Sequence, residues 1–100
     1  MTTKLAPFAL IILSLAACST APVQEMSDAR QAIRSAEIVG AVEHAPAYLA
    51  ASERLLREAQ ARLEAGAYDE ARRLALEARR QAIKAREHAA QATPVRLTPP

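Results

Sequence analysis

The stretch that decides the fold is residues 68–92, which read YDEARRLALEARRQAIKAREHAAQA. Its alanines recur at alternating spacings of four and three residues, so they share one face of a helix. That face comprises Ala71, Ala75, Ala78, Ala82, Ala85 and Ala89. Alanine at these core positions lets two helix axes approach more closely than leucine would. We therefore predict a helix over residues 68–92 that packs tightly against a neighbour.

That neighbour is predicted directly upstream, over residues 46–65. Its apolar or small residues step by three and four, namely Leu49, Ser52, Leu56, Ala59 and Leu63. Pro46 suits the first turn of a helix, where its missing N–H does no harm. Gly66 is placed to end the helix in a left-handed conformation. Because only residues 66–68 link the two helices, we predict an antiparallel hairpin.

A third helix is expected over residues 27–43. Ser27 can cap free backbone amides at its start, and an apolar stripe follows at helical spacing from Ala29 to Gly40. The helix should end before Pro46, which disfavours helical geometry at Ala45. The predicted fold is all-α, a small three-helix bundle over residues 27–92 built on the hairpin. Residues 93–100 contain three prolines and are expected to form a disordered tail.

The first 17 residues have the pattern of a secretory signal peptide. Lys4 precedes an apolar run over residues 5–17, which is too short for a helix that crosses a bilayer. The run ends in Leu15-Ala16-Ala17-Cys18, which resembles the lipobox of bacterial lipoproteins. Two other interpretations of this region are a buried Cys18 and an uncleaved signal anchor.

The lipobox resemblance implies that Cys18 becomes an acylated N-terminus with a lipid bilayer as its partner. Two or three acyl chains, such as palmitate, hold a protein stably on a membrane. Residues 18–26 would form the lipidated N-terminus and a flexible tether. Ser19 follows the cysteine, where aspartate would often retain such a lipoprotein at the inner membrane. The expected location is the periplasmic face of the outer membrane, or the cell membrane of an organism that lacks an outer one.

Composition argues against several classes of function. The charge is balanced, with 13 Lys and Arg against 11 Asp and Glu, so no nucleic-acid partner is expected. One cysteine and the separate His44 and His88 form no metal-ligand motif. Two glycines cannot build a phosphate-binding loop. We therefore expect no enzyme, no catalytic residues and no cofactor.

Two rows on the helix over residues 68–92 allow more than one interpretation. Leu76, Ile83 and Ala90 lie seven residues apart and point away from most of the alanine face. They either contact the helix over residues 27–43 or form an exposed interaction strip for a second copy or an envelope protein. A second row comprises Arg72, Arg79 and Arg86. It is either a solvated face or a surface for phosphate or lipid headgroups.

Two resemblances to known families follow from these residues. The pattern Leu63-x-x-Gly66-x-Tyr68-x-x-Ala71, within residues 59–78, resembles the turn and second helix of a tetratricopeptide repeat. Residues 29–92 resemble the domain of unknown function 4398, through Ala45-Pro46-x-x-Leu49, Ala59-x-x-x-Leu63, Gly66-x-Tyr68-x-x-Ala71 and Leu74-Ala75. That family implies an alanine-rich, helical, periplasmic lipoprotein of Gram-negative bacteria.

The combined expectation is a membrane-anchored periplasmic lipoprotein that serves as a structural or protein-interaction module. The alternative is a module that binds a peptide or a lipid in a groove between helices.

Overall fold

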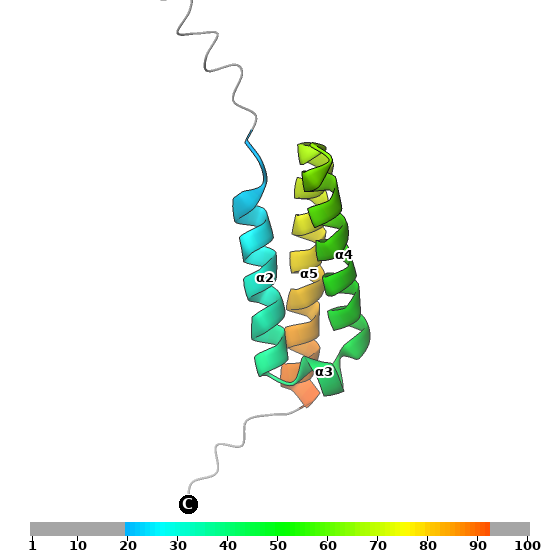
Figure 1. Cartoon of the computed structure of the whole chain (residues 1–100). Coiled ribbons are helices and arrows are strands. Elements are labelled where there is room, and N and C mark those ends of the chain that lie inside the picture. The colour runs from blue at the N-terminus through cyan, green and yellow to red at the C-terminus, as the bar shows by residue number, and fades with distance from the viewer. Residues whose placement is uncertain (1–19, 93–100) are drawn as a thin grey trace, which may run out of the picture.

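The computed structural model describes residues 20–92, which form three long helices and one short helix. The helices are α2 (Val23–Ile38), α3 (Ala41–His44), α4 (Pro46–Glu64) and α5 (Tyr68–Ala92). The three long helices lie side by side, and α3 crosses one end of them (Figure 1). The predicted all-α bundle on an antiparallel hairpin is confirmed. The expected signal peptide, Cys18 and the tail over residues 93–100 lie outside the described residues.

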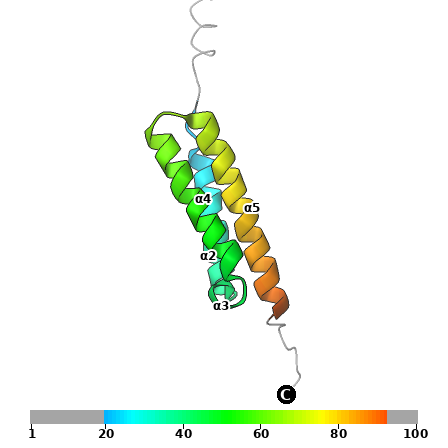
Figure 2. The same cartoon turned by 90° about the vertical axis from the view of Figure 1, so that its right-hand side faces the viewer.

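The hairpin of α4 and α5 is closed by the turn that Gly66 was expected to make. Gly66 has a φ of 80°, and its N–H donates to the Leu63 carbonyl at 3.0 Å. The N–H of Ala67 donates to the Arg62 carbonyl at 2.9 Å. Together these two bonds satisfy carbonyls that the end of a helix leaves free. Figure 2 shows the two helices running side by side from this turn.

The alanine face of α5 is the centre of the bundle. All six of its alanines are 0% exposed, because both α2 and α4 pack against α5. Toward the α3 end this face meets a cluster that includes Ile33 and Leu49, and toward the other end it meets Met26 and Ala59. Contacts between α2 and α4 are much fewer. The core is therefore built along α5, with small side chains that bring the helices close.

A buried serine sits in the middle of the hairpin without an unpaired polar atom. Ser52 is 0% exposed, and its Oγ donates to the Leu49 carbonyl one turn earlier at 2.7 Å. A hydroxyl that bonds to its own helix can be buried at low cost. Ser52 therefore acts as one more small residue in the core.

The first helix begins at Val23, four residues before Ser27, so the predicted start at Ser27 is wrong. Pro22 is the N-cap of α2 and is fully buried, and its carbonyl accepts the Met26 N–H at 3.1 Å. Met26 is 2% exposed and lies three residues before Ala29, on the same buried stripe. Residues 23–26 therefore belong to the bundle, and the prediction that they form part of a flexible tether is also wrong.

The predicted single helix over residues 27–43 is two helices. Gly40 has a φ of 91°, and its N–H donates to the Glu37 carbonyl at 3.0 Å, which ends α2. The chain then turns into α3 and buries Ala41 and Ala45 at the end of the bundle. Gly40 was placed in the apolar stripe, but its freedom to adopt a positive φ makes it the turn residue.

Candidate functional site

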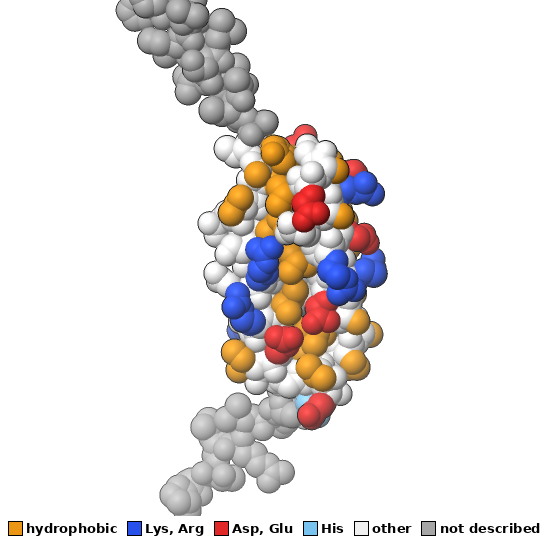
Figure 3. All heavy atoms as spheres, viewed as in Figure 1, with side chains coloured by type: hydrophobic (Ala, Val, Ile, Leu, Met, Phe, Trp, Pro, Cys, Tyr) orange, Lys and Arg blue, Asp and Glu red, His pale blue; other side chains and the backbone are white. Residues whose placement is uncertain are grey.

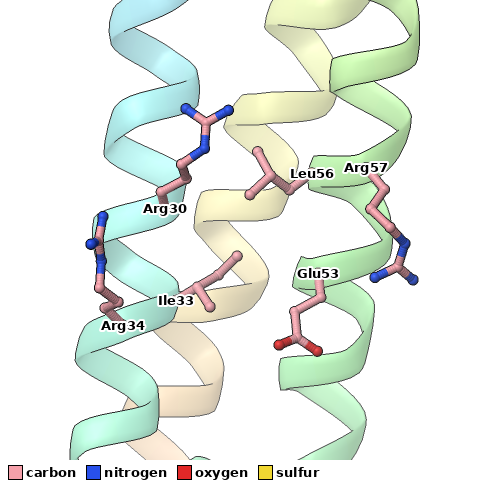
Figure 4. A pocket seen from close by; sticks show the side chains of 6 residues that line it. All are labelled: Arg30, Ile33, Arg34, Glu53, Leu56 and Arg57. Atoms are coloured by element: carbon pink, nitrogen blue, oxygen red, sulfur yellow. The ribbon is translucent and has the colours of Figure 1, made fainter.

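An open groove lies between α2 and α4, the two helices on either side of α5 in Figure 1. It has a volume of about 560 Å³. Its lining residues are Arg30, Ile33 and Arg34 from α2 and Glu53, Leu56 and Arg57 from α4 (Figure 4). Figure 3 shows apolar side chains running lengthwise along this face between flanking charged side chains. The groove is larger than a second surface hollow, which is described below.

The same sequence pattern places charged and apolar side chains on both walls of the groove. On α2 the pattern is Arg30-x-x-Ile33-Arg34, and on α4 it is Glu53-x-x-Leu56-Arg57. Residues three and four apart share a helix face, so each apolar side chain lies beside two charged ones. Ile33 is 7% exposed and Leu56 is half-buried. The walls therefore converge on an apolar floor.

The groove is electropositive, since three arginines face one glutamate. The Arg30 Nη2 donates to the Gln60 Oε1 at 3.3 Å, which links α2 to α4. Among residues 20–92, Arg34, Arg57 and Glu53 form no ion pair within 4.0 Å. An exposed guanidinium without a partner can donate two parallel hydrogen bonds to a carboxylate. The groove can therefore bind acidic groups over an apolar floor.

Arg72 fixes the start of the described chain to α5. Its Nη2 donates to the Thr20 carbonyl at 2.9 Å, and its Nε lies 3.4 Å from the Glu25 Oε2. Its Nη1 lies 3.4 Å from the Asp69 Oδ1. Arg72 therefore makes structural contacts, in contrast to the predicted solvated or headgroup-binding row.

Arg79 and Arg86, the other members of that row, lie at a second hollow. It has a volume of about 270 Å³ and lies between α2 and α5, where Ser35 and Ile83 also line it. Ile83 is half-buried there, whereas Leu76 is 37% exposed and Ala90 is exposed. The three residues of the candidate interaction strip thus differ in exposure, and Ile83 faces α2.

Several of the charged side chains of the bundle lie in surface ion pairs. Glu58 pairs with Arg54 at 3.2 Å, and Glu70 of α5 lies 3.8 Å from Arg62 of α4. Hydrogen bonds from Gln81 and from Arg80 lower the pKa of the Glu77 carboxyl. These contacts are exposed or half-buried, so each contributes little to stability.

The two histidines lie at the α3 end, apart from the groove. The His88 ring packs on Tyr48 with ring centroids 4.8 Å apart, and His44 is exposed. Within residues 20–92 no three His, Cys, Asp or Glu side chains gather where they could hold a metal ion. None of the helices in this range combines the length and apolar character that crossing a bilayer requires.

The sequence alone does not locate the groove between α2 and α4. Its periodicity places Ile33 and Leu56 in core stripes and indicates no role for Arg30 or Arg34. The repeated charged-x-x-apolar-Arg pattern was the available signal. It becomes informative only once α2 and α4 are known to face each other.

A family model for a domain of unknown function (DUF4398) matches residues 24–94. The matched range contains α3, α4, α5 and all but the first residue of α2. No curated protein and no solved structure gives a match. The family model thus covers the groove and both of its walls, and the chain belongs to the DUF4398 family.

Proposed function

We propose that the protein is a lipid-anchored module of the bacterial cell envelope that binds a partner protein with its helical bundle. The observation that carries this proposal is the open groove between α2 and α4. Its apolar floor, and Arg34 and Arg57, which form no ion pair with any residue from 20 to 92, suit the docking of another protein surface. A non-catalytic role is part of the proposal.

The anchor is assigned to Cys18 on the lipobox-like sequence that ends there. Acyl chains on this cysteine would hold the bundle at the membrane, on the periplasmic face of the outer membrane. The structure adds a constraint to this proposal, because Arg72 binds the Thr20 carbonyl. Only Ser19 lies between Thr20 and Cys18 in the sequence, and two residues of extended chain span at most about 7 Å. The bundle would therefore lie close to the lipid surface.

A second candidate is a groove that binds a free peptide or a lipid. The volume of about 560 Å³ falls in the range of small-ligand sites and favours this alternative. However, the groove is open, so an acyl chain in it would stay in contact with water. Binding of a protein surface therefore accounts better for its shape.

The anchor is tested by labelling cells with a radioactive fatty acid and separating their inner and outer membranes. We expect the wild-type chain to carry label in the outer membrane and Cys18→Ala to carry none. Ser19→Asp is the matched variant, since it should keep the label and move to the inner membrane. Equal labelling of the wild-type chain and Cys18→Ala would refute the anchor.

The binding role is tested separately, by chemical crosslinking in intact cells followed by mass spectrometry. We expect a specific protein neighbour linked to α2 or α4. Recovery of only lipid adducts would favour the second candidate, and recovery of no specific neighbour would refute the binding role.

A further inference from the structure

Among residues 20–92, no helix covers the side of the bundle between α2 and α4, whereas α5 covers the opposite side. Both α2 and α4 pack along α5, but they make few contacts with each other. The six alanines of α5 bring both helices close to it, whereas the larger Ile33 and Leu56 stand between α2 and α4. The result is a groove with an apolar floor; Figure 3 shows the apolar side chains along this face, and Figure 4 shows the residues that line the groove.

We propose that this groove binds one amphipathic helix of a partner protein, with acidic residues on both flanks of its apolar face. The apolar face would cover Ile33 and Leu56, and the carboxylates would bind Arg34 and Arg57. This inference rests on the proposed binding role and names the chemistry of the partner, but it does not depend on the lipid anchor.

A helix fits the groove because its walls are themselves helices. On each wall two charged residues lie four positions apart, which is about one helical turn. Side chains that are one turn apart on a bound helix would therefore lie opposite them. An amphipathic helix in a groove between helices is a common mode of protein recognition. A fourth helix placed here would give the apolar floor the cover that α5 gives to the other side.

Charge decides which kind of helix fits. The groove holds Arg30, Arg34 and Arg57 against Glu53, a formal charge of +2 from its four ionisable residues. An acidic helix is attracted to this surface, and a basic helix is repelled.

The same charge excludes two occupants from the chain itself. A second copy docked groove to groove would oppose two positive surfaces. Residues 93–100 carry Arg96 and no acidic residue, so this segment does not complement the positive groove.

The test uses a fluorescent peptide of about 18 residues, long enough to form a helix, with leucines on one face and glutamates on both flanks. A matched peptide carries lysines in place of the glutamates. The full chain is placed in phosphatidylcholine nanodiscs if it is acylated and kept in buffer if it is not, so the result is independent of the anchor. Fluorescence anisotropy measures binding, with empty nanodiscs as the blank.

The decisive comparison is between two double variants with the same change in charge. Arg34→Glu/Arg57→Glu reverses the groove, whereas Arg79→Glu/Arg86→Glu alters exposed arginines at the second hollow. Circular dichroism checks that each variant is folded. Arg34→Gln/Arg57→Gln replaces the first pair if charge reversal unfolds the bundle.

We expect the wild-type chain to bind the glutamate peptide at least about tenfold more tightly than the lysine peptide. The groove variant should lose this preference, and the control variant should keep its affinity within about threefold. The proposal is overturned if neither peptide binds, if both bind equally, or if the two double variants weaken binding alike.

Discussion

Replacing Ala82 by leucine measures how closely α2 and α4 pack on α5. Ala82 is 0% exposed and lies in the cluster that contains Ile33 and Leu49. Leucine adds three carbon atoms, whose burial would stabilise the fold by about 2.4 kcal/mol if room existed, at ~0.8 kcal/mol each. In a close-packed site the extra volume instead costs about 1–3 kcal/mol. We expect a net loss of about 1–3 kcal/mol in the free energy of unfolding, because helices cover Ala82 from both sides.

Urea unfolding followed by far-ultraviolet circular dichroism measures this loss. In a thermal scan each kcal/mol corresponds to a decrease of about 4–8 °C in Tm for a domain of this size. Ala90→Leu is the matched control, since Ala90 is exposed on the same helix. Leucine and alanine have similar helix propensities, so this control should stay within about 0.5 kcal/mol of the wild-type chain. If Ala82→Leu is as stable as the wild-type chain or more stable, and the control is unchanged, the close packing of α5 is refuted.

Three further predictions concern the turns, the start of α2 and one surface carboxylate. Gly66→Ala and Gly40→Ala should each cost about 1–2 kcal/mol, because both positions have a positive φ. Urea unfolding measures each loss, and an unchanged stability in either variant would contradict this expectation. Arg72→Ala should speed amide hydrogen exchange in the first turn of α2 but not in α4, because it releases the Thr20 carbonyl. Unchanged exchange in α2 would show that Arg72 does not stabilise the start of this helix. The folded-state pKa of Glu77 is lowered from 4.5, so its stabilisation is present above that pH and is lost as the pH falls through the lowered pKa. Glu77→Gln should therefore cost more stability near pH 7 than near pH 3, and the opposite order would refute this assignment.

The hairpin could be predicted from the sequence because its signals are local and agree with one another. The alanine face of α5 has a helical period, and Gly66 lies between this pattern and the helical pattern of α4. The structure buries the whole alanine face and gives Gly66 a φ of 80°. Local pattern and tertiary packing favour the same structure here.

The first helix was predicted less well because its boundaries depend on tertiary contacts. Pro22 and Met26 are ordered by burial against the bundle, which the polar residues around them do not indicate. Gly40 fits the apolar spacing of α2, yet the chain needs a turn there to reach α4. Such choices are decided by packing, because helix propensity is only a weak preference.

The groove could not be predicted because it depends on how α2 and α4 are placed relative to each other. The sequence shows two similar charged and apolar patterns, at residues 30–34 and 53–57. It does not show that these patterns face each other across an open side of the bundle. That arrangement follows from the close packing of both helices on α5.

The most direct test of the groove as the binding surface is site-specific photocrosslinking in intact cells. A photoreactive amino acid replaces Leu56 on the groove floor in one strain and Leu76 on the outer face of α5 in another. Our account predicts a discrete protein adduct from position 56 that disappears in the Arg34→Glu/Arg57→Glu background, and no such adduct from position 76. An adduct from position 76 alone, an adduct from position 56 that survives the charge reversal, or no adduct from either position would contradict it.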